Sequence, residues 1–311
     1  MESDLDKIVY MSVEEGFLES SQDSYLTSKR IVRKISELVT LFLVHPADYD
    51  LNSMKIKNVY LFEGEKLKQE KNSHIPQGDM FIIYGDETSK NVGLDFGRSQ
   101  YAFLKKLQEQ GNFKHFFNTP QAEENTMKDA LVEFSKNHIL QIADTFRFND
   151  YETTEDMLHK YGSLVLKPIF GCRGSGVHLI HRLDDLQKLD VGLDFIKGNY
   201  VLQEPLQGPE KRLVLLGGSL LCSRVHYNRK TPWNQDNKQE TYVYTPSDRE
   251  LELSQKIAEK AGLELAGIDF IGEKVNEING TGSGLVIYNH HNELLYDKSD
   301  AFVQRVISNL K

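Results

Sequence analysis

Three oxygen-bearing side chains near the C-terminus have a spacing that suits a metal ion. Residues 265–279 read as two strands joined by the loop Gly272–Lys274. In a hairpin with a three-residue loop, Asp269 lies directly opposite Glu277, and Asn279 shares their face because alternate strand residues point the same way. Carboxylates at cross-strand distance repel each other unless a cation lies between them. Since Mg²⁺ takes one or two carboxylates together with phosphate oxygens, the pattern predicts a magnesium site that also receives phosphates.

The length of this loop decides the interpretation, and an alternative stays open. A two-residue loop would place Asp269 on the opposite face of the hairpin from Glu277. An amphipathic hairpin with polar residues on its solvent face would explain the same pattern without any metal.

A glycine-rich segment, PIFGCRGSG, lies between two strand-like runs at 164–167 and 177–180. Its pattern G-x-x-G-x-G joins strand to strand, whereas the phosphate loops of P-loop and dinucleotide-binding proteins open a helix. Glycines in a hairpin loop let backbone N–H groups approach an anion closely. The segment therefore indicates a flap over phosphates, with an ordinary glycine-rich turn as the alternative.

Two arginines lie near the ends of two further strands, which meet at the turn Gly217–Gly218. Exposed at the mouth of a sheet, Arg212 and Arg224 would suit two-pronged contacts to phosphate or carboxylate. Taken singly, each is better explained as a solvated surface charge, so their value depends on the residues that they flank.

The elements that must position these residues fall into two parts. In the first third, strand-like runs alternate with amphipathic helices, which predicts a small parallel sheet with helices on its faces. The expected elements there are strands at 7–11, 39–44 and 80–84 and helices at 26–37 and 99–109. Because Pro120 disfavours helix in the residue before it, we place a domain boundary near residue 118. Beyond it we expect helices at 123–137 and 249–261, the second ending at Gly262 as a C-cap.

Composition and charge exclude several classes of protein. The chain of 311 residues has 37 Lys and Arg against 46 Asp and Glu, a net charge of −9. This balance argues against a nucleic-acid or anionic-lipid partner, and two cysteines offer neither a disulfide framework nor a zinc spacing. The N-terminus is acidic where a secretion signal is basic, and no apolar run approaches the ~20 residues of a membrane span. We therefore expect a cytoplasmic protein without membrane partners, and leave open a homodimer or a homotetramer.

The motifs occur in an order that resembles a known superfamily. LVLKPIFGCRGSGV is followed by LQEPL, EKRLVLLGG and AGIDFIGEKVNEINGTGSG, and is preceded by FNTPQAEENTMKDAL. Over about residues 115–311 this order resembles the ATP-grasp superfamily, and most closely the bacterial glutathione synthetases. The resemblance implies an α/β (α+β) ATP-grasp fold in three parts. These are an N-terminal βαβ pre-ATP-grasp substrate domain at 1–117, a lid subdomain with the glycine loop at 118–202, and a C-terminal antiparallel-sheet subdomain with metal and substrate sites at 203–311.

The resemblance also implies a role for each candidate residue. Arg212 and Arg224 would be catalytic, and Asp269, Glu277 and Asn279 would bind two Mg²⁺ ions, with Mn²⁺ as a substitute. ATP would be held by Lys128, Lys167, the loop residues Gly171, Arg173, Gly174, Ser175 and Gly176, the hinge residues Gln203, Glu204, Pro205 and Leu206, whose backbone reads adenine, and Glu210. A substrate would contact Gly280, Thr281, Gly282 and Ser283.

The chemistry that the resemblance implies is amide-bond formation by an ATP-dependent carboxylate–amine ligase. ATP phosphorylates a carboxylate to an acyl phosphate, and an amine then displaces the phosphate. Metal ions and Lys or Arg side chains neutralise the charge that builds up on the phosphoryl oxygens. The substrates would be small molecules or peptides.

Three departures from the family concern the choice of substrates. Glu210 stands where glutathione synthetases usually have Asp, the segment VHYNRKTPWNQDNKQETYVY after Arg224 lacks their glycines, and the loop GTGSG lacks their proline. We interpret these changes as a different donor or acceptor with ATP chemistry retained. Glutathione synthesis, ligation of amino acids to a peptide or protein, and peptide macrocyclisation stay open. A non-catalytic ATP-binding regulator is less favoured, because every charged position that the chemistry needs is filled.

Overall fold

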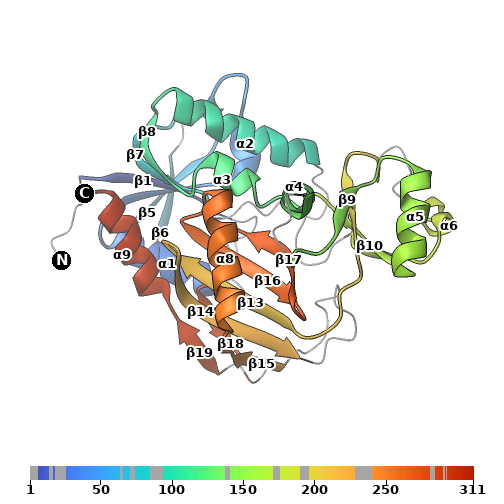
Figure 1. Cartoon of the computed structure of the whole chain (residues 1–311). Coiled ribbons are helices and arrows are strands. Elements are labelled where there is room, and N and C mark those ends of the chain that lie inside the picture. The colour runs from blue at the N-terminus through green and yellow to red at the C-terminus, as the bar shows by residue number, and fades with distance from the viewer. Residues whose placement is uncertain are drawn as a thin grey trace.

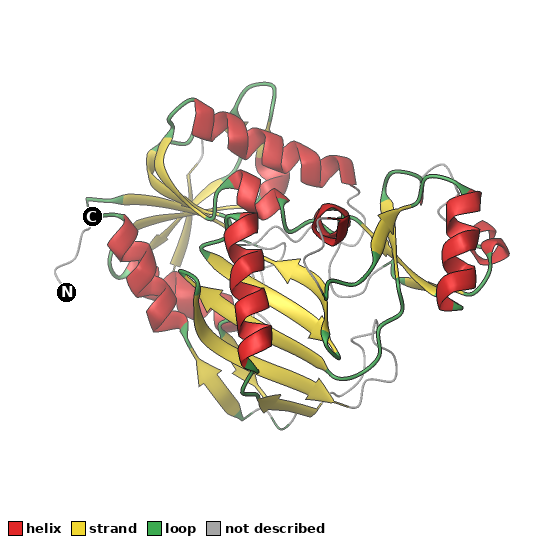
Figure 2. Cartoon of the chain, in the orientation of Figure 1, coloured by secondary structure: helices red, strands yellow, loops and turns green. Residues whose placement is uncertain are grey.

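Figures 1 and 2 show a chain built around three larger sheets that carry their helices on the outside. The computed structural model describes residues 6–13, 17, 26–63, 66–70, 74–84, 94–136, 141–170, 176–189, 196–227, 240–280, 284–289, 291 and 293–311. Among these residues, no helix is both long enough and apolar enough to span a bilayer.

The first sheet has the strand order β6-β5-β2-β1-β7-β8. Its parallel strands are β1 (Ile8–Ser12), β2 (Thr40–Val44), β7 (Gly78–Ile82) and β8 (Phe113–Phe117), and β5 (Val59–Glu63) and β6 (Lys66–Glu70) extend it antiparallel. A 3-10 helix, η2 (Pro46–Asp48), and the short pair β3 (Tyr49–Asp50) and β4 (Lys55–Ile56) follow β2. The parallel arrangement of the three predicted strands is confirmed, whereas the antiparallel extension by β5 and β6 was not predicted.

Helices cover both faces of this first sheet. Figure 1 shows α2 (Leu94–Glu109) above it, and α1 (Leu26–Ser36) together with α9 (Ser299–Asn309) below it. Alternation along β1 divides the two cores, because Val9 and Met11 pack with α1 and α9 while Tyr10 packs with α2. The last helix of the chain therefore closes the first sheet.

The second sheet is antiparallel and has the order β11-β10-β12-β9. It consists of β9 (Thr145–Arg147), β10 (Leu164–Pro168), β11 (His178–Ile180) and β12 (Tyr200–Gln203), and carries α5 (Tyr151–Tyr161) and α6 (Leu183–Gln187) with a core of its own. The antiparallel pairing of β10 with β11 confirms that the glycine-rich segment joins strand to strand.

The third sheet has the order β15-β14-β13-β16-β17 and packs one face against α8. Its elements are β13 (Glu210–Leu216), β14 (Ser219–Tyr227), β15 (Glu240–Val243), α8 (Asp248–Ala261), β16 (Leu265–Ile271) and β17 (Lys274–Asn279). The small pair β18 (Val286–Tyr288) and β19 (Leu294–Asp297) leads on to α9. The predicted C-cap of α8 is confirmed, since Gly262 has a left-handed φ of 75°.

The single helix predicted at 123–137 is wrong. Two short helices, α3 (Pro120–Glu124) and α4 (Ala130–Lys136), replace it. The Asn125 side chain donates to the carbonyl of Ala261, 3.1 Å away, and the Thr126 hydroxyl donates to the carbonyl of Glu123 at 2.7 Å. These side chains compete with the helical backbone pattern, and the resulting break contains Lys128.

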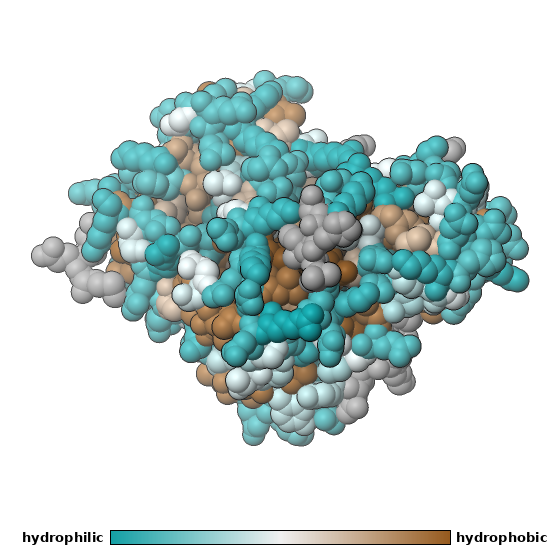
Figure 3. Space-filling view, in the orientation of Figure 1, coloured by the Kyte–Doolittle hydropathy of each residue, from teal (hydrophilic) through white to brown (hydrophobic). Residues whose placement is uncertain are grey.

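The surface of the face in Figure 3 is mostly hydrophilic, as the charged composition leads one to expect. Hydrophobic residues gather mainly in the middle of the view, beside α8.

A capping box starts α8 and involves an unusually acidic carboxyl group. Ser247 and Glu250 cap each other, and Lys211 and Tyr244 also donate hydrogen bonds to the Glu250 carboxylate. Burial alone would raise the pKa of Glu250, but these hydrogen bonds outweigh it and lower the pKa to about 2. Folding therefore stabilises the ionised form of Glu250.

We expect Glu250→Gln to destabilise the chain in a pH-dependent way. The folded pKa of about 2 lies below the ordinary 4.5, so the stabilisation is complete above 4.5 and is lost as the pH falls toward 2. Because hydrogen bonds to a charged group stabilise by about 1 kcal/mol more than those to a neutral one, we expect a loss of about 1 kcal/mol at neutral pH. Urea unfolding of the wild type and the variant at neutral and acidic pH measures the difference between their free energies of unfolding. This difference should become smaller as the pH falls. Glu252→Gln, at an exposed position nearby, is the control. A difference in the free energy of unfolding between wild type and Glu250→Gln that is the same at every pH would contradict the expectation.

Candidate active site

The hairpin β16–β17 carries the predicted metal ligands in the expected register, but its turn and its strand pairing differ from the predicted ones. The loop is a two-residue turn, Gly272–Glu273, because Ile271 pairs with Lys274. The predicted three-residue loop is therefore wrong. The ladder shifts by one residue at a β-bulge, and Asp269 then pairs directly with Glu277.

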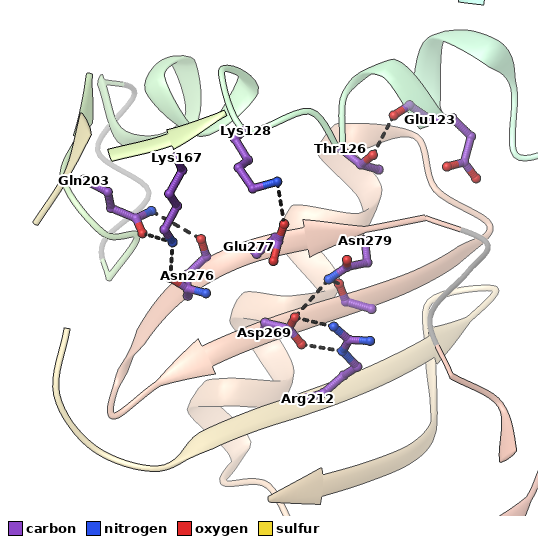
Figure 4. A network of polar contacts seen from close by, with 11 residues as sticks. Glu123, Thr126, Lys128, Lys167, Gln203, Arg212, Asp269, Asn276, Glu277 and Asn279 are labelled. Atoms are coloured by element: carbon purple, nitrogen blue, oxygen red, sulfur yellow. Dashed lines mark hydrogen bonds and ion pairs between the residues drawn. The ribbon is translucent and has the colours of Figure 1, made fainter. Parts of the chain in front are cut away.

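The extra residue of this bulge is Asn276, and it brings one more polar side chain to the site. Phe270 pairs with Val275 and Asp269 with Glu277, so Asn276 has no opposite residue. Its amide oxygen lies 2.7 Å from the Nζ of Lys167, on the same side as Glu277 (Figure 4). Sequence reasoning missed Asn276, because alternation along an unbroken strand would have turned it away from Glu277.

Four charged residues form a row across four neighbouring strands of the third sheet. Arg224 of β14 pairs with Arg212 of β13, Arg212 with Asp269 of β16, and Asp269 with Glu277 of β17. Residues directly opposite each other share a face of the sheet. The face away from α8 thus presents two cations followed by two carboxylates, which we call the charged row.

The middle of the charged row is a two-pronged ion pair. The Nε and Nη2 atoms of Arg212 donate to the two carboxylate oxygens of Asp269, each at 2.5 Å, and Asn279 donates to the same carboxylate at 3.0 Å (Figure 4). Burial disfavours the charge on Arg212, but Asp269 outweighs it and raises the pKa of Arg212. Asp269 is only 2% exposed, so this ion pair lies inside the protein.

Two buried lysines from other elements reach the far end of the row. Lys128, in the break between α3 and α4, lies 3.0 Å from the Glu277 carboxylate, and Lys167 of β10 contacts Asn276 and Gln203. Burial would raise the pKa of Glu277, but the charges of Lys128 and Lys167 outweigh it and lower that pKa. The structure therefore brings both predicted phosphate-binding lysines to the predicted metal ligands (Figure 4).

Arg224, at the other end of the row, is not exposed as predicted. It is 9% exposed, and its Nε and Nη1 atoms are buried with no hydrogen-bond partner in the described part of the chain. Gly284 explains the burial, because the backbone there lies so close that an added Cβ would be 2.8 Å from the Arg224 Nη1. Burial and the neighbouring Arg212 lower the pKa of Arg224. Tyr296 and Asp269 oppose this lowering only in part. Removing a cation from water is costly, and an anionic ligand beside Arg224 would offset that cost.

The donor atoms at Asp269, Glu277 and Asn279 fit a hard cation such as Mg²⁺. Two carboxylates and one amide oxygen lie on one face, and a carboxylate that binds Arg or Lys keeps lone pairs for a metal. Among the described residues, no group of three or more His, Cys, Asp or Glu could hold a metal by itself. The remaining ligands would then be water and substrate oxygens, which is how Mg²⁺ usually binds in nucleotide sites.

The remaining predicted residues lie around this site or outside the described residues. Gln203 touches Lys167, whereas the Glu204 carboxylate accepts hydrogen bonds from Lys274 and from the backbone N–H of Asp144. Buried Glu210 precedes Arg212 by two residues and shares its face. Gly176 and Gly280 are described, while Gly171, Arg173, Gly174, Ser175, Thr281, Gly282 and Ser283 lie outside the described residues.

Known proteins resemble this chain in both sequence and fold. The family model "Prokaryotic glutathione synthetase, ATP-grasp domain" matches residues 131–288. A glutathione synthetase of Neisseria meningitidis serogroup B (strain ATCC BAA-335 / MC58) is 26% identical over 192 residues, which cover 57% of this chain. The match spans only 58% of that relative's length.

Solved structures with the same fold cover nearly the whole chain. The D-cycloserine synthetase DcsG has a TM-score of 0.67 at 13% identity, over 98% of this chain and 100% of that one. The ATP-grasp ligase PsnB, solved with a phosphomimetic variant of a minimal precursor, Mg and ADP, has a TM-score of 0.64 at 15% identity, over 99% and 100%. At such low identity these two structures show the ATP-grasp fold alone. Since the family model covers half of the sequence, the chain belongs to the prokaryotic glutathione synthetase ATP-grasp family.

Proposed function

We propose that this protein is an ATP- and Mg²⁺-dependent ligase that joins a carboxylate to an amine through an acyl phosphate. The observation that carries the proposal is the convergence of the charged row with two buried lysines. Lys128 and Lys167 reach Glu277 and Asn276, while Arg212 and Arg224 continue the row beyond Asp269. Cations on both sides of a carboxylate pair suit a polyphosphate, its metal ion and a developing anion.

Each group of residues has a distinct task in this proposal. Lys128 and Lys167 bind and orient the phosphates of ATP. Asp269, Glu277 and Asn279 hold Mg²⁺, which neutralises charge on the phosphoryl oxygens that are transferred. Arg212 and Arg224 bind the acyl phosphate and the oxyanion that forms when the amine attacks. The chemistry asks for no nucleophilic side chain from the protein.

The finer assignments complete the proposal. Two Mg²⁺ ions, replaceable by Mn²⁺, occupy the site, the backbone of Gln203–Leu206 reads adenine, and Glu210 assists ATP binding. The loop Gly171–Gly176 covers the phosphates, and Gly280–Ser283 meets a substrate. We also propose the division at 1–117, 118–202 and 203–311, a cytoplasmic location and a homo-oligomeric state. The first sheet ends at Phe117, which supports the first boundary.

Two classes of substrate follow from the family and from its departures. Kinship with glutathione synthetases supports a γ-glutamyl dipeptide and glycine. The glycine-free segment after Arg224 and the missing proline favour another donor or acceptor. The neighbour PsnB is also solved with a precursor peptide, which supports a peptide as the second class, for amino-acid ligation or for macrocyclisation. The non-catalytic ATP-binding regulator is the remaining alternative.

A panel assay distinguishes these possibilities. The purified chain is incubated with ATP and Mg²⁺ against single amino acids, amino-acid pairs, peptides, and a γ-glutamyl dipeptide with glycine. ADP release and the mass of the products are measured. We expect at least one pair to accelerate ADP formation by about tenfold or more over ATP alone, with an equal amount of amide. ATP binding without any acceleration across the panel would favour the regulator.

A further inference from the structure

A buried carboxylate outside the charged row lies against the end of the metal-bearing hairpin. Glu123 of α3 is only 3% exposed, and its Oε1 accepts a hydrogen bond of 2.6 Å from the side-chain amide of Asn118. Carboxylates are almost never buried this deeply without specific partners. Figure 4 shows Glu123 near the end of β17, beyond Asn279.

The Glu123 carboxylate fills the space that a side chain at position 280 would occupy. A Cβ added to Gly280 would lie 1.8 Å from the Glu123 Oε2 and 2.4 Å from its Cδ, far inside contact distance. Gly280 does not have the positive φ of many other glycines, so its backbone would accept alanine if Glu123 were absent. Gly280 follows Asn279 directly, and Asn279 donates to Asp269.

Asn118 connects this contact to the other strand of the hairpin. Its side-chain oxygen accepts hydrogen bonds from the backbone N–H groups of Glu264 at 2.7 Å and Leu265 at 3.1 Å, and its amide donates to the Leu265 carbonyl at 2.9 Å. Asn118 has a φ of 51°, a conformation that asparagine tolerates better than most residues. One side-chain pair thus links the start of β16 with the end of β17.

We propose that Glu123 is a positioning residue for the proposed ligase site, and this inference rests on the proposed function. Held by Asn118, its carboxylate fixes the backbone at Gly280 and with it the side chain of Asn279. Asn279 then stays on the face of Asp269 and Glu277, where the metal and the phosphates are to bind. Neither the family match nor the pattern of charged motifs assigns a role to Glu123.

A double-mutant cycle at Glu123 and Gly280 tests the inference. Wild type, Glu123→Ala, Gly280→Ala and the double variant are compared by calorimetric binding of Mg²⁺ and ADP, by kcat and KM with an active substrate pair, and by thermal unfolding. We expect Gly280→Ala to lower Mg²⁺-dependent ADP affinity by about 100-fold, and kcat with it, in the Glu123 background. In the Glu123→Ala background the same change should cost less than about threefold.

Two further variants separate the possible causes. Glu123→Gln keeps the size of the side chain and should not rescue Gly280→Ala. Glu124→Gln changes the next carboxylate of α3, which is half-buried and pairs with Lys105, and should leave kcat, KM and ADP affinity unchanged. Effects that simply multiply in the double variant would overturn the inference, as would a Gly280→Ala chain with normal ADP binding. Calorimetry measures ADP binding and needs no turnover. If no substrate pair is ligated but the effects on ADP binding are non-additive, the proposed reaction is refuted while the role of Glu123 in positioning the hairpin is supported.

Discussion

Asp269→Asn should lower ATP-dependent turnover by about a thousandfold or more, the largest loss expected for one substitution. The change removes a carboxylate from the proposed metal site and leaves the guanidinium of Arg212 without its counter-charge. Breaking a buried ion pair on one side typically costs about 3–5 kcal/mol of stability. ADP release and thermal unfolding must therefore be measured together.

Suitable controls separate lost chemistry from lost folding. Asp269→Asn combined with Arg212→Met removes both charges and should recover stability without recovering turnover. Asp300→Asn removes an exposed carboxylate that pairs with Lys34 on the surface and should leave turnover unchanged. An Asp269→Asn chain that unfolds like wild type and turns over normally would remove Asp269 from the site.

Arg224→Met should make the chain more stable and much less active. Two buried nitrogens of Arg224 have no hydrogen-bond partner among the residues that the structure describes, which costs free energy in the free protein. Methionine fills similar space without a charge. We expect the melting temperature to rise by a few degrees. Turnover should fall by about 100-fold or more, because the cation that meets the developing anion is lost.

Differential scanning fluorimetry and ADP release measure both effects on the same sample. Arg305→Met is a matched control, since that exposed arginine pairs with Glu264 away from the charged row. It should change neither turnover nor melting temperature appreciably. A destabilised Arg224→Met chain with wild-type turnover would show that the guanidinium serves packing and not an anion.

Local signals in the sequence suffice to predict the elements whose causes are local. The helix α8 was predicted because its periodicity and its C-cap Gly262 lie within one segment. The parallel first sheet and the β10–β11 hairpin follow in the same way from alternation and chain order. The break between α3 and α4 does not, because the apolar spacing continues through it and its cause is a contact of Asn125 with distant Ala261.

The candidate site was predicted in part, and the pairing of its two carboxylates was predicted correctly from a loop length that is wrong. The pairing of Asp269 with Glu277 holds because the bulge at Asn276 offsets a turn that is one residue shorter than predicted. A bulge is a property of the paired strands and has no signature in either strand alone. The burial of Arg224 was missed because the chain returns over it at Gly284. No spacing rule reveals such a long-range contact, nor that of Lys128 with Glu277.

An oxygen label tests the proposed reaction most directly. A carboxylate substrate from the active pair is prepared with ¹⁸O in the carboxyl group and incubated with ATP, Mg²⁺ and the amine. If a carboxylate oxygen attacks the γ-phosphorus and the amine then expels phosphate, each amide formed releases one phosphate that carries one ¹⁸O atom. Mass spectrometry of the released phosphate should show this stoichiometry. Amide formation with unlabelled phosphate would contradict the acyl phosphate route.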